Sequence, residues 1–202
     1  MSDVGKQKVE FSPTERLILL LLYALGGKIK GKLWIQKMFF ELAKAFDSLR
    51  EELDYDAYLY GPFSEALDEF IDMMENSGLI KDLRLTEEGF SVAEQEWKGA
   101  SPEEEEIIEK NGKFLHNLDE DELILYTYVM SPKMAERSDI KERILKRRLE
   151  IVLRMLKEGK ISMGLAAKLA GVPITKIRER AIRAGIKPFN AQNGIECRNK
   201  NE

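Results

Sequence analysis

Residues 161–177 read ISMGLAAKLAGVPITKI, and this stretch predicts two short helices joined by a tight turn. Ser162 can cap the first helix, because its hydroxyl can accept a hydrogen bond from a free backbone N–H of the first turn. Gly171 can take the left-handed conformation that a tight turn between helices needs. The apolar Val172 and Ile177 can fill the angle between the two helices. The helices of this predicted helix-turn-helix cover residues 163–170 and 174–184.

The second of these helices carries many cations. Arginine can donate two hydrogen bonds to a guanine edge, and lysine pairs with phosphates, as in a DNA recognition helix. A helical hairpin with a solvated basic face, or a basic helix that contacts something other than nucleic acid, would show the same pattern. The residues that we expect to contact double-stranded DNA are Thr175, Lys176, Arg178, Arg180 and Arg183.

The charge of the chain is divided between two parts. Residues 1–135 contain 15 Lys and Arg against 28 Asp and Glu, a net charge of −13. Residues 136–202 contain 17 Lys and Arg against 8 Asp and Glu, a net charge of +9. This division suggests two functional parts with different partners, and the run Lys146-Arg147-Arg148 adds cations close to the predicted helix-turn-helix. The alternative is that the two parts attract each other within the fold.

Residues 148–189 also carry a series of short motifs. These are Gly159-Lys160-Ile161-Ser162, then Ala166-Ala167, then Leu169-Ala170-Gly171 and finally Gly185-Ile186. In this order the segment resembles a family of small, uncharacterised antitoxin-like proteins of prokaryotes. It differs from them in having Ile177 where an aromatic residue is usual, and in lacking an acidic ending after Phe189. The resemblance implies a DNA-binding role for this segment.

The first part of the chain predicts a winged-helix-like domain over residues 11–98, because three helices are followed by short strands. Ser12 and Pro13 are typical of a helix start, and the pair Gly26-Gly27 predicts where this helix ends. The other expected elements are helices over residues 32–50 and 63–76, an extended segment over residues 54–60, a turn at Gly61-Pro62, a strand over residues 79–85, and a turn or short helix that starts at residues 87–89.

The third helix of this domain is strongly acidic. It has no Lys or Arg between Phe63 and Asn76, and DNA affinity depends on cations that neutralise phosphates. We therefore expect this domain to bind a protein partner with a basic surface instead of DNA. The residues expected at that contact are Tyr60, Glu65, Asp68, Glu69, Asp72 and Glu75.

Short motifs in the same domain carry a second resemblance. They are Lys32-Leu33, Tyr60-Gly61-Pro62-Phe63-Ser64, Leu67, Ser77-Gly78-Leu79-Ile80 and Leu85-Thr86-Glu87-Glu88-Gly89. With these motifs, residues 32–97 resemble a Panacea domain, the SocA-like antitoxin domain. The resemblance implies that the domain neutralises a toxin by direct contact or serves as a proteolysis adaptor. A simple turn at Gly61-Pro62 and an ordinary helix end would also account for the most distinctive of these motifs.

The whole chain is expected to be mostly α-helical. A long amphipathic helix over residues 139–158, ended by Gly159, precedes the helix-turn-helix. Because one helix-turn-helix contacts little DNA, we expect a homodimer, with Ile140, Ile144 and Leu145 at its contact unless they pack within the chain. The expected units are a winged-helix-like domain over residues 11–98, a helical connector over residues 102–136, a basic helical domain over residues 138–189 and a flexible tail over residues 190–202.

The sequence contains no motif for catalysis, a cofactor or a metal. His116 and Cys197 are its single histidine and cysteine, and we expect His116 to be a surface side chain or a hydrogen-bonded one. The longest apolar run, residues 17–25, is too short to span a membrane, and no signal peptide is apparent, so we expect a cytoplasmic protein. The favoured function is a DNA-binding regulator of antitoxin type. The alternatives are a transcription factor without a toxin partner and an interaction adaptor without a DNA role.

Overall fold

The computed structural model describes residues 10–186, and this part of the chain is mostly α-helical, as expected. Ten α-helices, one short 3-10 helix and two small antiparallel sheets make up its regular structure. The tail expected over residues 190–202 lies outside the described residues. The elements in chain order are α1 (Pro13–Ala24), α2 (Lys32–Leu42), α3 (Asp47–Glu52), β1 (Asp56–Tyr58), β2 (Gly61–Phe63), α4 (Glu65–Asn76), β3 (Ile80–Lys81), β4 (Arg84–Leu85), α5 (Glu87–Lys98), α6 (Pro102–Asn117), α7 (Glu120–Met130), η1 (Pro132–Ala135), α8 (Lys141–Lys157), α9 (Met163–Ala170) and α10 (Ile174–Arg183).

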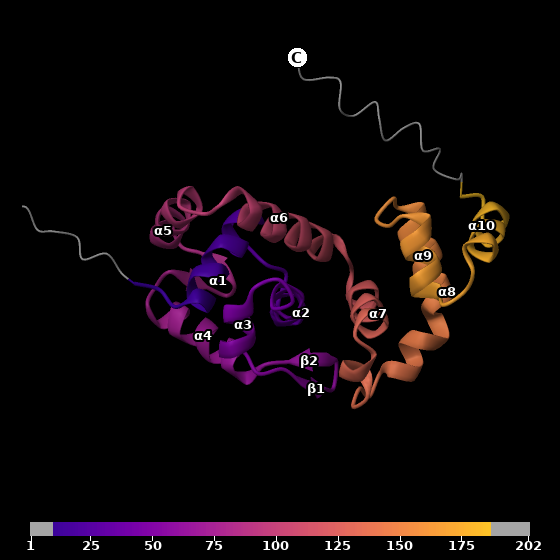
Figure 1. Cartoon of the computed structure of the whole chain (residues 1–202), viewed down its shortest axis with the longest axis horizontal. Helices are drawn as coiled ribbons and strands as arrows, with labels where there is room; N and C mark the ends of the chain where they lie inside the picture. Colours follow the sequence, from indigo (N-terminus) through magenta and orange to yellow (C-terminus); the bar gives the residue numbers. More distant parts are fainter. Residues whose placement is uncertain (1–9, 187–202) are drawn as a thin grey trace, which may run out of the picture.

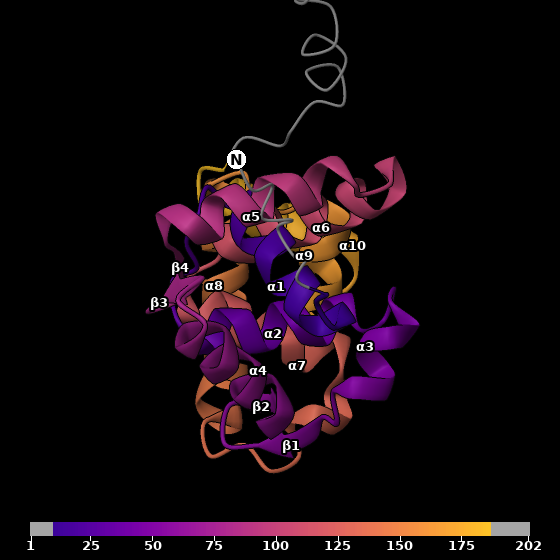
Figure 2. The same ribbon diagram turned by 90° about the vertical axis from the view of Figure 1, so that its left-hand side faces the viewer.

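Helix α1 is the centre of the N-terminal body, which contains the elements from α1 to α6 (Figure 1). The Ser12 side chain accepts a hydrogen bond from the Glu15 N–H, and the Glu15 carboxylate accepts one from the Ser12 N–H. Residues 17–22 are all buried, because α3, α4, α5 and α6 pack around the helix. In Figure 2, α1 lies between α5 above it and α4 below it.

The helix expected over residues 32–50 is interrupted in the structure, so that expectation is wrong. Helix α2 ends at Leu42, and a turn separates it from α3. The interruption brings α3 against α1, where Leu49 is buried. There the Glu52 carboxylate accepts a hydrogen bond from the Thr14 N–H at 3.1 Å. This bond satisfies one of the free N–H groups at the start of α1.

The turn expected at Gly61-Pro62 is formed instead by Leu59 and Tyr60. Gly61 and Pro62 belong to strand β2, which pairs antiparallel with β1. Gly61 has a φ of +96°, and a Cβ atom at this position would lie 3.2 Å from the ring of Tyr128. A glycine is therefore favoured here both by the backbone conformation and by the close approach of α7.

The single strand expected over residues 79–85 is a hairpin of two short strands, β3 and β4. Asp82 and Leu83 form its turn with φ values of 50° and 56°, the positive values that a two-residue hairpin turn of this kind requires. The Leu83 carbonyl accepts a hydrogen bond from the Ile29 N–H at 3.1 Å, so the segment before α2 lies beside the hairpin. The glutamates after β4 begin α5, which is longer than the turn or short helix expected there.

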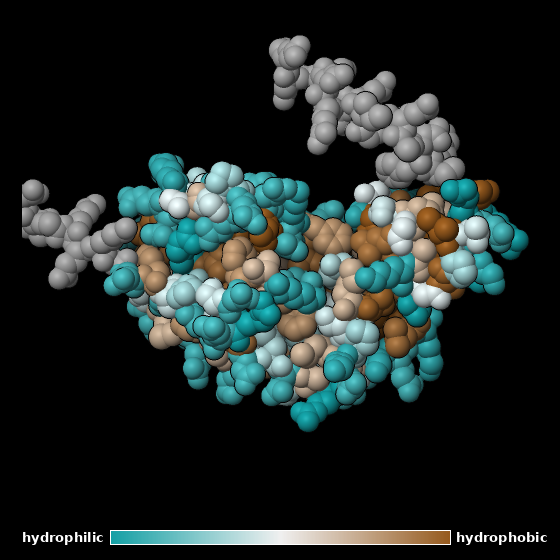
Figure 3. Space-filling model, viewed as in Figure 1, coloured by the Kyte–Doolittle hydropathy of each residue, from teal (hydrophilic) through white to brown (hydrophobic). Residues whose placement is uncertain are grey.

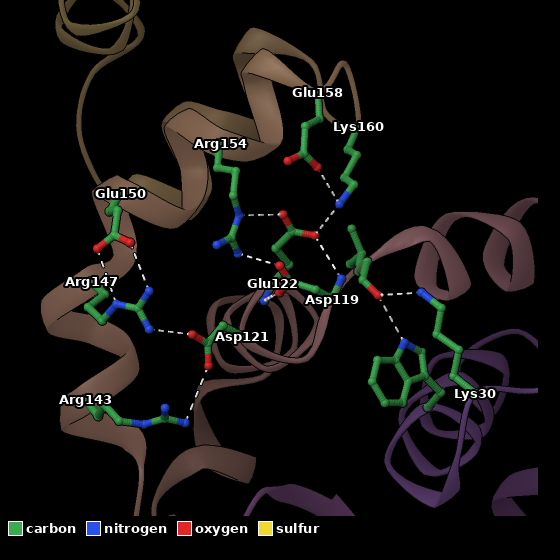
Figure 4. A network of polar contacts seen from close by, with 12 residues as sticks. Lys30, Asp119, Asp121, Glu122, Arg143, Arg147, Glu150, Arg154, Glu158 and Lys160 are labelled. Atoms are coloured by element: carbon green, nitrogen blue, oxygen red, sulfur yellow. Dashed lines mark hydrogen bonds and ion pairs between the residues drawn. The ribbon is translucent and has the colours of Figure 1, made fainter. Parts of the chain in front are cut away.

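Helix α7 connects the N-terminal body to the C-terminal helices, because it packs against α2 on one side and against α8 and α9 on the other. Its start is fixed by the carbonyl oxygen of Leu118. That oxygen accepts hydrogen bonds from Trp34 Nε1 at 3.2 Å and from Lys30 Nζ at 3.1 Å (Figure 4). Both donors come from the N-terminal body, so α7 belongs to the same packed structure.

Helix α8 begins at Lys141, slightly later than the sequence predicts, and ends before Gly159 as expected. Ile144 is fully buried within the chain, so it does not form a surface for a dimer. Ile140 and Leu145 are partly buried and pack against the core of the same chain. Ile144 therefore packs within its own chain, which was the alternative to the dimer contact expected for it.

A buried carboxylate joins α7 to α8 and to the turn that follows α8 (Figure 4). Glu122 is fully buried, and its side chain accepts hydrogen bonds from Arg154 Nε at 3.3 Å and from Lys160 Nζ at 2.8 Å. It also accepts a hydrogen bond from the Asp119 N–H at 2.9 Å, which is one half of the capping box of α7. These donors compensate for the loss of water around the carboxylate, which is the condition for burying a charge.

A more exposed set of ion pairs extends this contact along α8. The Asp121 carboxylate lies 2.6 Å from Arg147 Nη1 and 3.4 Å from Arg143 Nη2. Arg154 pairs with Asp119 as well as with Glu122. The attraction between the acidic and basic parts, which the sequence left open, is thus realised between the N-terminus of α7 and one face of α8.

Replacing Glu122 with alanine should lower the free energy of unfolding by about 1.5–3 kcal/mol, because α7 loses half of its capping box and Arg154 and Lys160 each lose a charge-assisted hydrogen bond. The two cations keep Asp119 and Glu158 as partners. Replacing Glu150 with alanine should change it by no more than about 1 kcal/mol, because the Glu150–Arg147 pair is exposed on both sides. Urea unfolding followed by circular dichroism measures both. Equal losses in the two variants would contradict the role assigned to Glu122.

Candidate functional site

Helices α9 and α10 form the two-helix unit that the sequence predicts. The Ser162 hydroxyl accepts a hydrogen bond from the Leu165 N–H at 3.2 Å and caps α9. Gly171 lies between the helices with φ 66° and ψ 34°, the expected left-handed conformation. Ile177 and Ala181 are buried, so they form the inner face of α10. The remaining side chains of α10 are exposed.

Arg148 of α8 holds the end of α9. Its Nε donates a hydrogen bond to the Leu169 carbonyl at 2.9 Å. Its guanidinium lies so close to Gly171 that a Cβ atom there would be 2.8 Å from Nη1. Glycine at this position is therefore needed for the positive φ and also for the close approach of Arg148. A structural role for Arg148 corrects the expectation that it adds to a DNA-binding patch.

A groove of about 560 Å³ runs between α8 and α10. Lys176, Arg180 and Arg183 line it from α10 together with Glu179, and Leu149 and Leu153 line it from α8. Figure 3 shows hydrophobic residues over α8 and α9 on the face drawn and hydrophilic residues along the outer edge of α10. The structure therefore brings together three of the five predicted DNA-binding residues, beside an apolar strip that the sequence pattern did not indicate.

The other two predicted DNA-binding residues, Thr175 and Arg178, do not line this groove. Residues two apart in an α-helix are rotated by about 200°, so Arg178 points away from Arg180. All five predicted residues are exposed, and so is the acidic Glu179 that lies between them on the helix. The exposed side of α10 is thus wide enough to present cations in two directions.

The cations of the C-terminal part fall into two groups, which differ in whether they pair with carboxylates of the same chain. Arg147 pairs with Asp121 and with Glu150, and the cations that contact Glu122 are likewise engaged within the chain. Within residues 10–186, no ion pair involves any cation of α10, and those cations are Lys176, Arg178, Arg180 and Arg183. The positive charge available to a partner is therefore concentrated on α10, and less of it lies on α8 than the sequence suggests.

The acidic helix α4 is also partly used within the fold. Asp68 is paired with Lys32 at 3.1 Å and accepts a hydrogen bond from Gln36 Nε2 at 3.0 Å. The Glu75 carboxylate accepts a hydrogen bond from the Asp82 N–H at 2.9 Å, which steadies the β3–β4 turn. The predicted contact residues that stay exposed without such a bond in the described part of the chain are Glu65, Glu69 and Asp72, spaced three or four apart on one face.

The hairpin β1–β2 presents aromatic side chains next to α4. Tyr58 and Tyr60 have 53% and 46% of their surface exposed. Gln36 holds the end of the hairpin, because its side chain bonds both the N–H and the carbonyl of Ser64, at 2.9 and 2.8 Å. The predicted contact residue Tyr60 is thus surface-exposed on a fixed hairpin.

Lys37 lies buried behind this hairpin, with 3% of its surface exposed. Its Nζ donates a hydrogen bond to the Pro62 carbonyl at 2.8 Å. Burial lowers the pKa of Lys37 to about 7, since the charged form loses its hydration. No pattern in the sequence singles this residue out, because a lysine in an amphipathic helix is usually found at the surface.

The structure of His116 differs from the expectation of a surface side chain or a hydrogen-bonded one. Its Nε2 atom is buried and has no hydrogen-bond partner in the described structure. Burial lowers the pKa of this histidine, and the nearby Lys30 and Lys28 lower it further. Within residues 10–186, no group of three or more His, Cys, Asp or Glu side chains is placed to hold a metal ion, and no helix is long and apolar enough to cross a membrane.

No protein-family model, curated protein or solved structure matches this chain. The resemblances to the Panacea domain and to the antitoxin-like family therefore stay predictions, and function has to be inferred from the geometry of α4, α10 and the hairpin β1–β2.

The buried Lys37 should make stability depend on pH. Its pKa is about 7 in the folded protein against 10.5 in the unfolded chain. Between these values the unfolded chain binds the extra proton, so the free energy of unfolding rises with pH by up to about 1.4 kcal/mol per pH unit. Below pH 7 both states are protonated, and the cost of burying the charge is complete and constant.

Lys37→Met should abolish this rise, whereas Lys98→Met, a change at an exposed lysine, should keep it. Urea unfolding at several pH values between 6 and 10 gives the slopes. Parallel curves for the two variants would show that Lys37 does not titrate in this range.

Proposed function

We propose that this protein is a DNA-binding regulator without enzymatic activity, in which α9 and α10 contact double-stranded DNA and the acidic N-terminal domain binds a protein partner. The observation that carries the proposal is the separation of cations. Those on one face of α8 are engaged with carboxylates, whereas the four on α10 are exposed and unpaired within residues 10–186. DNA binding needs cations that are available to replace the counterions of phosphates.

The build of α9 and α10 supports a helix-turn-helix role. The turn at Gly171 packs α10 against α9 through Ile177, and it leaves the first turns of α10 exposed. Recognition helices contact base edges with residues near their N-terminus, which here include Thr175, Lys176 and Arg178. Arg180 and Arg183 follow on the groove side, where they suit the phosphate backbone.

The order of elements in the N-terminal body supports a winged-helix-like domain. Helix α1 is followed by an extended segment whose Lys28 bridges to Arg84 of β4, and then by α2. After the inserted α3 and hairpin β1–β2 come α4 and the hairpin β3–β4. In that arrangement α4 occupies the position of a DNA-reading helix. Its exposed Glu65, Glu69 and Asp72 would repel phosphates, so a basic protein surface is the better partner.

The resemblance to the Panacea domain supports a toxin as this partner. The Tyr60-Gly61-Pro62 step on which the resemblance depends lies on the fixed hairpin that leads directly into the acidic helix α4. We propose a homodimer on an operator with two half-sites, with a contact that does not include the buried Ile144.

A second candidate function is an interaction adaptor with no DNA role. It is favoured by the exposed Ile174 and Ile182, which have 46% and 56% of their surface exposed on α10. Apolar side chains at these positions suit a protein contact as well as the methyl groups of thymine. DNA binding by the intact protein decides between the two functions.

Replacing Lys176, Arg180 and Arg183 with alanine should weaken binding to a duplex taken from upstream of the protein's own coding sequence. The slope of log Kobs against log salt should become shallower by about 1 for each phosphate that the protein no longer neutralises. The side chains are exposed, so folding should be unchanged. Fluorescence anisotropy at several salt concentrations measures both quantities.

The matched control replaces Lys98, Lys110 and Lys113 on α5 and α6, which removes the same charge at exposed positions away from α10 (Figure 1). This variant should bind DNA nearly as the unaltered protein does. If both triple variants show the same drop in affinity, the contact is a general effect of net charge. If neither shows any, α10 does not bind DNA.

Changing Glu65, Glu69 and Asp72 to lysine should abolish binding of a basic protein partner and leave DNA binding intact or slightly stronger. Like charges that face each other across an interface cost several kcal/mol. Where a small basic reading frame overlaps or adjoins the coding sequence, its product is the partner to use, with pull-down of the purified proteins as the measurement. Loss of DNA binding in a folded variant would show instead that this face serves a dimer or a contact with the C-terminal helices.

A further inference from the structure

A small cavity of about 220 Å³ lies between α2 and the hairpin β1–β2. Its apolar walls are Leu33, Tyr58, Tyr60 and Phe63. The rest of the lining is Gly61, Gln36 and two lysines, Lys32 and Lys37. The volume is below the roughly 300–1,000 Å³ of pockets for drug-sized ligands. The cavity therefore suits a group of about the size of one amino-acid side chain.

The lysines give this apolar cavity a positive character. Lys37 is buried, and within residues 10–186 its Nζ makes one hydrogen bond, to the Pro62 carbonyl. An ammonium group has three donors, so the charged form of Lys37 is left short of acceptors. Lys32 stands at the exposed rim, where its one carboxylate partner is Asp68. An anion in the cavity would supply the acceptor that Lys37 lacks.

The aromatic side chains that line the cavity indicate which kind of chemical group carries the anion. The rings of Tyr58 and Phe63 lie 5.3 Å apart between centroids and are tilted by 32°. Tyr58 and Tyr60 are about half exposed, although aromatic side chains contribute most when they are covered. An apolar group placed against them would gain burial. A doubly charged phosphate is disfavoured, because the Asp68 carboxylate is bonded to Lys32 and Gln36, which both line the cavity.

We propose that this cavity binds a carboxylate attached to one apolar group, in which the carboxylate meets Lys37 and the apolar group lies against the tyrosines. The same chemistry is presented by the C-terminal residue of a protein chain and by a free aromatic or branched acid. The binding site does not depend on the proposed DNA role, because it involves none of α8, α9 and α10.

The test uses the full-length protein and N-acetyl-phenylalanine as the probe, with its uncharged amide as the control. Binding is followed by calorimetry and by the shifts of the backbone NMR signals of the hairpin. The acid should bind at least tenfold more tightly than the amide, and it should shift signals between Tyr58 and Phe63. Equal affinity for acid and amide, or shifts elsewhere only, would overturn the proposal.

Two kinds of variant locate the site. Lys37→Met keeps the length of the buried side chain and should reduce the affinity for the acid at least tenfold. Tyr60→Ala changes an exposed residue, so it should fold even if the buried variant does not, and it too should weaken binding. Phe90→Ala removes a similarly exposed aromatic side chain on α5 and should have no effect. Unchanged binding in Tyr60→Ala, or in folded Lys37→Met, would refute the site.

A comparison of ligands then identifies the source of the carboxylate. A short peptide that ends in phenylalanine, with a free C-terminus, is compared with 3-phenylpropionate. Tighter binding of the peptide indicates a chain end, and equal or tighter binding of the free acid indicates a small molecule. Failure of both to bind overturns the proposal. None of these measurements involves DNA, so the outcome is separate from that of the proposed DNA binding.

Discussion

The relation between the two parts of this protein depends on the buried carboxylate of Glu122. This residue completes the cap of α7 by accepting the Asp119 N–H, and it also accepts hydrogen bonds from Arg154 and Lys160. A buried charge is stable only when its partners are held in place, so α8 and the turn after it are fixed against α7. Arg148 on α8 then holds the end of α9, and the position of α10 follows from that contact.

This use of charge within the fold decides which charges are left for function. The arginines of α8 that face α7 are paired, whereas those of α10 are exposed on the C-terminal unit. On α4, Asp68 pairs with Lys32 of α2, Glu75 bonds the β3–β4 turn, and the remaining exposed carboxylates lie on one face. Each candidate surface therefore has one predominant sign of charge, which favours different partners for the two parts.

The hairpin β1–β2 is fixed from two sides. Gln36 and Lys37 hold it from α2 through Ser64 and Pro62. From the other side, the Ser138 hydroxyl donates a hydrogen bond to the Leu59 carbonyl at 2.8 Å, just before α8 begins. The hairpin that carries the exposed tyrosines is thus held between α2 and the segment that leads to α8, although the two are distant in the sequence.

Local sequence determined the elements whose ends depend on single residues: Ser12, Ser162 and Gly171 placed the starts of α1 and α9 and the turn before α10, because caps and left-handed turns involve only neighbouring residues. The break after α2 and the hairpin turn at Leu59 depended on contacts with α1 and α7, which no local pattern contains. The candidate sites, too, could be predicted only as far as local sequence determines them. The residue types and total charge of α10 and α4 could be read from the sequence. Only tertiary packing decided which charges are neutralised, that Lys37 is buried, and that a cavity forms beside it, since each depends on residues far apart in the chain.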